Sequence, residues 1–161
     1  MHYIKASKIK SMSQSFSQLF THIIFSTKNR VGWLDDEITT DLYPYINKIL
    51  QNQNSPLIQI GGIENHIHIL CSLAKNLSVS KLVEEIKTSS SKLVKTKSPN
   101  YKDFYWQHGY GAFSISPGHK NIVDNYIANQ KQHHKKISYE DELCKLLQKY
   151  NVSFDKKYVL D

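Results

Sequence analysis

Hydrophobic and polar residues follow two different periods along the chain, and these periods predict strands alternating with helices. Short runs rich in β-branched and aromatic residues predict strands at residues 18–27, 57–63, 65–73 and 111–116. Apolar residues recurring every three or four positions predict helices at residues 35–50, 80–94, 119–134 and 138–150. Pro44 falls inside the first helix, and we expect it to kink the helix or split it in two.

The order of these elements is strand–helix–strand–strand–helix–strand, which is typical of a ferredoxin-like α+β sandwich. We therefore predict a central antiparallel sheet, followed by two further C-terminal helices. Residues 1–17 are expected to form a polar, mobile tail, and residues 18–161 a single domain. In such a fold one face of the sheet carries helices, and we expect the other face to meet a partner or a substrate.

Composition fits one globular domain of 161 residues, with 40% hydrophobic and 22% charged residues. No apolar stretch approaches the ~20 residues that span a bilayer, and residues 1–17 lack the apolar core of a secretory signal. The two cysteines, Cys71 and Cys144, stand far apart and are expected to be separate thiols. We expect a cytoplasmic protein without a membrane partner.

A formal net charge of +7 favours a polyanionic partner. Arg30 is the single arginine among 21 basic residues. Because arginine is the usual reader of guanine and lysine acts as a point charge, this surface suits contact with phosphates better than contact with base edges. A compositional bias of the genome explains the same ratio equally well.

His66 and His68 stand two residues apart in an otherwise apolar predicted strand. Residues at this spacing project from the same face of a strand, so both imidazoles would point together. With eight histidines in the chain, two half-exposed histidines are an even alternative on spacing alone. Buried imidazoles need polar partners, however, and one divalent metal ion would serve both. Two ligands are too few, so a third must come from elsewhere.

Tyr126 and Gln130 stand four residues apart in a predicted helix, and such residues are neighbours on one helix face. A tyrosine at this position can equally be a core residue with a satisfied hydroxyl group. Gln130 favours a functional role, because its amide oxygen would complete a site of two nitrogens and one oxygen. Such a site suits Mn²⁺ or Mg²⁺, and it can also bind Zn²⁺ or Ni²⁺. A tyrosine beside a metal indicates attack on a phosphodiester.

These residues lie in segments that resemble the HUH single-tyrosine transposases of small bacterial and archaeal insertion sequences. The similarity runs from about Leu19 to Asp161 and rests on LFTHIIFSTKNR, GGIENHIHIL, WQHGYGAFSIS, YIANQKQHH and FDKKYVLD. The histidine pair combined with the Y-x-x-x-Q helix is a specific pattern, whereas H-x-H alone is not. The segment before Gln14 has no counterpart in the family.

The resemblance implies metal ligation by His66, His68 and Gln130, with Mg²⁺ or Mn²⁺ as the cofactor, and Tyr126 as the nucleophile. It implies a DNA-associated prokaryotic enzyme that cuts and rejoins single-stranded DNA at hairpin-marked element ends through a 5′-phosphotyrosine. It also implies a homodimer in which the tyrosine helix of one subunit completes the active site of the other.

Two other classes of function remain open at the level of the sequence. A non-catalytic nucleic-acid-binding module would stack bases on aromatic residues such as Phe104, Tyr105 and Trp106. A metal-dependent phosphodiesterase would activate water in place of the tyrosine, and its product would carry no protein adduct.

Overall fold

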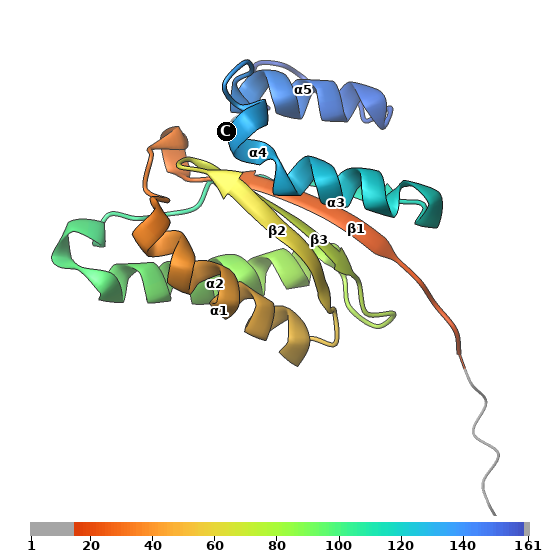
Figure 1. Cartoon of the computed structure of the whole chain (residues 1–161), viewed down its shortest axis with the longest axis horizontal. Coiled ribbons are helices and arrows are strands. Elements are labelled where there is room, and N and C mark those ends of the chain that lie inside the picture. The colour runs from red at the N-terminus through yellow and green to blue at the C-terminus, as the bar shows by residue number, and fades with distance from the viewer. Residues whose placement is uncertain (1–14, 160–161) are drawn as a thin grey trace, which may run out of the picture.

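A computed structural model describes residues 15–159 (Figure 1). The strands are β1 (Phe20–Ser26), β2 (Leu57–Ile63), β3 (His66–Ser72) and β4 (Gly111–Ile115). The α-helices are α1 (Asp36–Asn52), α2 (Val79–Lys97), α3 (Lys120–Ala128), α4 (Gln130–His133) and α5 (Tyr139–Lys149). Short 3-10 turns lie at Lys28–Arg30, Pro99–Tyr101 and Pro117–His119. The expected tail at residues 1–17 lies almost wholly outside the described residues.

The four strands form one antiparallel sheet in the order β2-β3-β1-β4. Strands β1 and β3 lie in the centre, and their register pairs Ile24 with His68 and Ser26 with His66. Together with the two helices α1 and α2, this order confirms the predicted ferredoxin-like α+β sandwich. The histidine pair therefore lies on a central strand, which neighbouring strands hold from both sides.

Helices α1 and α2 cover one face of the sheet and form the larger core with it (Figure 1). Side chains from β1 and β3, such as Phe25, Ile67 and Ile69, point into this core and are fully buried. The side chain of Asp35 caps α1 by accepting from the backbone N–H of Ile38, and that of Ser78 caps α2 by accepting from Lys81. The predicted starts of these helices, at residues 35 and 80, lie within two residues of the caps.

The opposite face of the sheet is also covered, by α3, α4 and α5 (Figure 1). Two smaller apolar clusters hold these helices: Leu70 and Ile127 lie in one, and Ile24 and Leu143 lie in the other. The expectation that this face is open to a partner or a substrate is therefore wrong for the single chain. The side chains of His66 and His68 point to this second face, so the C-terminal helices enclose them.

Three details differ from the expectations for single elements. Helix α1 runs unbroken through Pro44, so the predicted split is wrong; the surrounding apolar contacts of α1 compensate for the missing N–H group. The predicted helix over residues 119–134 is interrupted at Asn129, which separates α3 from α4. Phe104 and Trp106 are buried in the larger core, whereas Tyr105 is half exposed and is the one of the three aromatic residues able to stack a base.

Cys71 and Cys144 are both buried free thiols, as expected. Within residues 15–159, none of the helices has the length and apolar character that crossing a membrane requires.

Candidate active site

His66 and His68 lie side by side on β3, with ring centroids 5.2 Å apart and both side chains fully buried. Their spacing of two residues on a strand accounts for this, as the sequence predicts. Burial lowers the pKa of His66 to about 4 and also lowers the pKa of His68, because a charged imidazole loses its hydration there. Both rings are therefore neutral at pH 7, which is the state that ligates metals.

Two neighbours fix how these rings are oriented. Nδ1 of His66 lies 2.7 Å from Oδ1 of Asn65 and donates to it, which leaves the lone pair on Nε2. Nδ1 of His68 lies 2.9 Å from Nε2 of His22, on the adjacent strand β1. When His68 donates to His22, Nε2 of His68 also carries a free lone pair. Sequence reasoning identifies neither residue: the role of His22 depends on strand pairing, and that of Asn65 on the conformation of the turn before β3.

Helix α3 brings Tyr126 to the histidine pair. The centroid of the Tyr126 ring lies 5.8 Å from that of His68, and the two rings meet edge to face. The helix approaches closely because Gly61 on β2 has no side chain: a Cβ there would lie 2.5 Å from the carbonyl oxygen of Ile127. Gln59 on β2 also donates to Asp124 on α3 at 2.9 Å. Strand β2 thus sets the height of Tyr126 above the sheet.

Gln130 reaches the same place in spite of the interruption at Asn129. Its side chain is 1% exposed, and Nε2 lies 3.4 Å from the backbone oxygen of Tyr126. One helical turn therefore still separates the two residues, as predicted. The structure brings all four predicted residues, namely Tyr126, His66, His68 and Gln130, together within one chain.

Three buried polar atoms of this group lack a hydrogen-bond partner: Nε2 of His66, Nε2 of His68 and Oε1 of Gln130. Buried polar atoms are rarely left without partners, because each costs roughly 1–3 kcal/mol. All three are electron-pair donors of the kinds that bind divalent metal ions. The residues present therefore fit a divalent metal ion.

Sequence reasoning misses two further residues at this place, Glu142 on α5 and His134 after α4. With His66 and His68 they form a group whose ligand atoms lie within 4.8 Å of one another. Oε2 of Glu142 lies 3.3 Å from Nε2 of His66 and 3.4 Å from Nε2 of His68. The local sequence is only a weak indication that Glu142 is buried. Glu142 lies on the same side of α5 as the apolar residues Leu143 and Leu147, and this pattern by itself predicts an ordinary amphipathic helix.

The carboxylate of Glu142 joins the histidines to the tyrosine. Its Oε1 accepts a hydrogen bond from the hydroxyl group of Tyr126 and lies 3.2 Å from Nε2 of Gln130, which donates to it. Burial would raise the pKa of Glu142, but the hydrogen bond from His134 and the nearby rings of His66 and His68 outweigh burial and hold that pKa well below its usual range. Burial, and then the charge of Glu142, raise the pKa of Tyr126, so its hydroxyl group is protonated in this arrangement.

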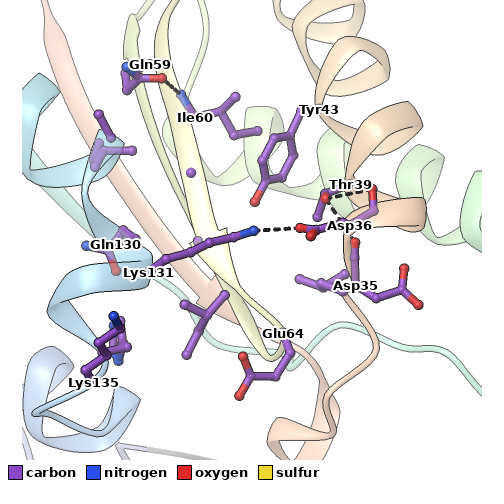
Figure 2. Close-up of a pocket in the computed structure, with 17 residues that line it drawn as sticks. Asp35, Asp36, Thr39, Tyr43, Gln59, Ile60, Glu64, Gln130, Lys131 and Lys135 are labelled. Carbon is purple, nitrogen blue, oxygen red and sulfur yellow. Dashed lines mark hydrogen bonds and ion pairs between the residues drawn. The ribbon is translucent and has the colours of Figure 1, made fainter.

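Two openings reach the site. A cleft of about 750 Å³ runs between β2, α1 and α4 and is lined by Gln130 and His134; Lys131 of α4 spans it to pair with Asp36 at 2.6 Å (Figure 2). A smaller cavity of about 250 Å³ lies between α3 and α5 and is lined by Tyr126 and Glu142, with two lysines of α5 beside them. Of the two, the smaller opening is the one that Tyr126 lines.

A ferredoxin-like sheet with a buried histidine pair on a central strand and a tyrosine on a following helix defines the class of HUH-type transposases. The sequence pattern of the family described as "Transposase IS200 like" matches residues 15–130, which is most of the chain. The chain belongs to this family.

Two solved structures are similar in fold. One is a candidate transposase from Deinococcus radiodurans R1, with a TM-score of 0.59 and 21% identity; the similarity covers 76% of this chain and 98% of that one. The other is a REP-associated tyrosine transposase bound to a REP hairpin, with a TM-score of 0.59 and 15% identity, covering 80% of this chain and 76% of that one. A search of curated proteins found no match.

Proposed function

We propose that this transposase cuts and rejoins single-stranded DNA at hairpin-marked ends, with Tyr126 as the nucleophile. The observation that carries the proposal is a set of three buried ligand atoms without partners, on His66, His68 and Gln130. All three residues contact the carboxylate of Glu142, which also accepts a hydrogen bond from the hydroxyl group of Tyr126. Membership of the family and the hairpin bound to one relative of the same fold support the choice of substrate.

His66, His68 and Gln130 would hold a divalent metal ion, Mg²⁺ or Mn²⁺. When bound, the ion supplies positive charge to the non-bridging oxygens of the scissile phosphate and orients it. The histidines and the amide are neutral, so the ion would keep positive charge that attracts an anionic phosphate. The water-excluding helices α3 and α5 strengthen this attraction.

The oxygen of Tyr126 attacks the phosphorus atom, a bond forms between them, and the hydroxyl group gives up its proton, which balances the proton taken up by the leaving oxygen. The bond from phosphorus to the 3′ oxygen breaks, and that oxygen keeps the electron pair and takes up a proton. The products are a 5′-phosphotyrosine and a free 3′-hydroxyl group. Because the phosphotyrosine conserves the bond energy, a new 3′-hydroxyl group can reverse the reaction without ATP.

The smaller cavity offers a route for the DNA strand to Tyr126. Lys145 and Lys149 of α5 line it together with the exposed side chain of Ile122 on α3. Lysines at such an entrance attract the phosphates of any sequence. Sequence selection would then rest on the folded shape of the hairpin.

We also propose that the active protein is a homodimer with shared active sites. The single chain assembles its tyrosine and histidines in cis, with α3 following β4 through the short turn at Pro117–His119. A shared site requires α3 and the elements after it to move onto the partner's sheet. The small apolar clusters beneath these helices make such an exchange less costly than opening the larger core.

The proposal is tested with hairpin oligonucleotides taken from DNA flanking the gene, labelled at one end or the other. With Mn²⁺ or Mg²⁺, a 3′ label should become attached to the protein, and a 5′ label should stay on a shorter free strand. Tyr126→Phe should abolish the adduct and retain hairpin binding, and EDTA should abolish cleavage. Tyr158→Phe, which changes an exposed tyrosine, serves as the control.

Other outcomes would identify the two alternative classes. Cleavage without an adduct, and unaffected by Tyr126→Phe, would indicate a phosphodiesterase that uses water. Hairpin binding without any cleavage under all metal conditions would indicate a binding module. A normal adduct yield from Tyr126→Phe would overturn the assignment of the nucleophile.

A further inference from the structure

Glu142 is the only carboxylate in the buried cluster around the histidine pair, as far as residues 15–159 describe it. The residue lies on α5, beyond the segment 15–130 that matches the family pattern. Its side chain is 2% exposed, although a glutamate is almost never fully buried without a compensating cation. The family pattern therefore does not account for the most buried acidic group in the site.

The position of the carboxylate oxygen is that of a metal ligand. Oε2 of Glu142 lies 3.3 Å from Nε2 of His66 and 3.4 Å from Nε2 of His68, and neither nitrogen has a hydrogen-bond partner. Ligand bonds of ~2.1 Å place neighbouring donor atoms about 3.0–3.5 Å apart around one ion. Two nitrogen lone pairs and an anionic oxygen facing each other at this spacing repel one another, and a cation between them removes the repulsion.

Protonated histidines would be the other way to remove this repulsion. Both rings are fully buried, where a charged imidazole loses its hydration. Nδ1 of His66 already donates to Asn65, so its neutral ring carries no hydrogen on Nε2. The contacts of His66 and His68 with Oε2 of Glu142, at 3.3 and 3.4 Å, are longer than the 2.7 Å hydrogen bond that the same oxygen accepts from His134.

His134 has a different role, although it belongs to the same cluster. Its Nδ1 lies 2.7 Å from the carbonyl oxygen of Ile137, and its Nε2 lies 2.7 Å from Oε2 of Glu142. Both partners accept hydrogen bonds, so the ring donates from both nitrogens and has no lone pair for a metal. His134 thus holds the carboxylate in place, as hydrogen-bonding partners of metal-bound carboxylates commonly do.

We infer that Glu142 is a further ligand of the divalent ion, so that α5 supplies an anionic oxygen to the site formed by His66, His68 and Gln130. This inference rests on the proposed function. It gives the ion a negatively charged ligand before any DNA phosphate arrives. It also links the ion to the nucleophile, because the other oxygen of Glu142 accepts from the hydroxyl group of Tyr126.

The test measures binding of Co²⁺ to the full chain without DNA, by calorimetry and by the visible absorption of the bound ion. Glu142→Gln removes the charge and keeps the shape, and it should lower the affinity at least about tenfold. Glu140→Gln is the matched control, because Glu140 is an exposed glutamate in the same helical turn of α5. The control should bind Co²⁺ as the wild type does.

Each result decides between the proposals. If a His66→Ala, His68→Ala double variant loses Co²⁺ while Glu142→Gln keeps wild-type affinity, this inference is wrong and the proposed metal centre stands. If Glu142→Gln binds more tightly, the carboxylate competes with the ion, and the inference is again wrong. If the wild type binds no Co²⁺, the metal centre of the proposed function fails as well.

A crystal structure of the Co²⁺-loaded wild type gives an answer that does not depend on the folding of any variant. Oε2 of Glu142 should lie within about 2.2 Å of the ion. A separation beyond about 3 Å, with the ion on His66 and His68, would overturn the inference alone.

Discussion

Nε2 of His22 on β1 lies 2.9 Å from Nδ1 of His68 on β3, so one histidine orients another across two paired strands. Removing such a hydrogen bond from a ligating histidine typically lowers metal affinity 10- to 100-fold. We predict this loss for His22→Phe, measured by Co²⁺ titration, with cleavage largely restored at high metal concentration. His108→Phe, at an exposed histidine, should leave the affinity unchanged.

Gly61 sets the distance between α3 and the sheet. Because a Cβ at this position would lie 2.5 Å from the carbonyl oxygen of Ile127, Gly61→Ala must push α3 outward. We expect a loss of about 1–3 kcal/mol in the free energy of unfolding and a lower adduct yield, since Tyr126 moves with the helix. At Gly118 a Cβ would meet nothing within 4 Å, so Gly118→Ala should change neither quantity.

Stability should fall as the pH drops from about 6.5 in the presence of EDTA. Burial lowers the pKa of His22 to about 3 and that of His66 to about 4, and it lowers the pKa of His68. Between these pKa values and pH 6.5 the unfolded chain binds more protons than the folded chain. As the pH falls, each of these histidines therefore lowers the free energy of unfolding by up to about 1.4 kcal/mol per pH unit.

His134 and Glu142 affect the pH dependence of stability outside that interval. Burial lowers the pKa of His134, but its hydrogen bond to Glu142 raises the pKa more, so its stabilising effect is lost as the pH rises above 6.5. The contribution of Glu142, whose pKa is depressed, is lost only below about 4.5. Urea unfolding at a series of pH values should therefore give a maximum near pH 6.5. A stability that increases from pH 6.5 to 5 would contradict the neutral state of the buried histidines.

Lys145 and Lys149 should contribute to DNA binding without selecting sequence. Each lysine-to-alanine change should weaken binding of a single-stranded oligonucleotide and reduce the slope of log K against log salt by about 0.7. Lys48→Ala, at an exposed position on α1 beneath the other face of the sheet, is the control. Equal effects of all three changes would argue against the cavity between α3 and α5 as the DNA entrance.

Mixing two inactive variants tests whether the active sites are shared. His66→Ala and Tyr126→Phe proteins, mixed under conditions that exchange subunits, should recover adduct formation if the tyrosine comes from the partner, because one site of the heterodimer is then intact. Sites built within one chain, as in the single-chain structure, would each keep a lesion. Inactivity of a proven heterodimer would refute sharing and leave the tyrosine chemistry untouched.

The order of elements and the histidine pair could be predicted from the sequence because each depends on local periodicity. His66 and His68 need only the alternation of a strand, and Tyr126 and Gln130 need only one turn of helix. The structure brings all four residues together, while their chemical roles stay predictions.

His22, Gly61 and Glu142 could not be predicted, because their roles arise from contacts between distant segments. His22 acts through strand pairing, and Gly61 through the approach of α3 to β2. Glu142 lies in the first turn of an amphipathic helix, where an acidic residue is also expected from the helix dipole alone. Nothing in its local sequence separates a solvated glutamate from a buried one.

The sheet separates a large core under α1 and α2 from two small clusters under α3 and α5. Segments with little buried apolar surface open at lower free energy than the rest of a protein. Amide hydrogens of α3 and α5 should therefore exchange with deuterium sooner than those of β1 and β3. If Tyr126 is the nucleophile, as proposed, this division lets it leave the sheet and return while the strand bearing the histidines stays folded.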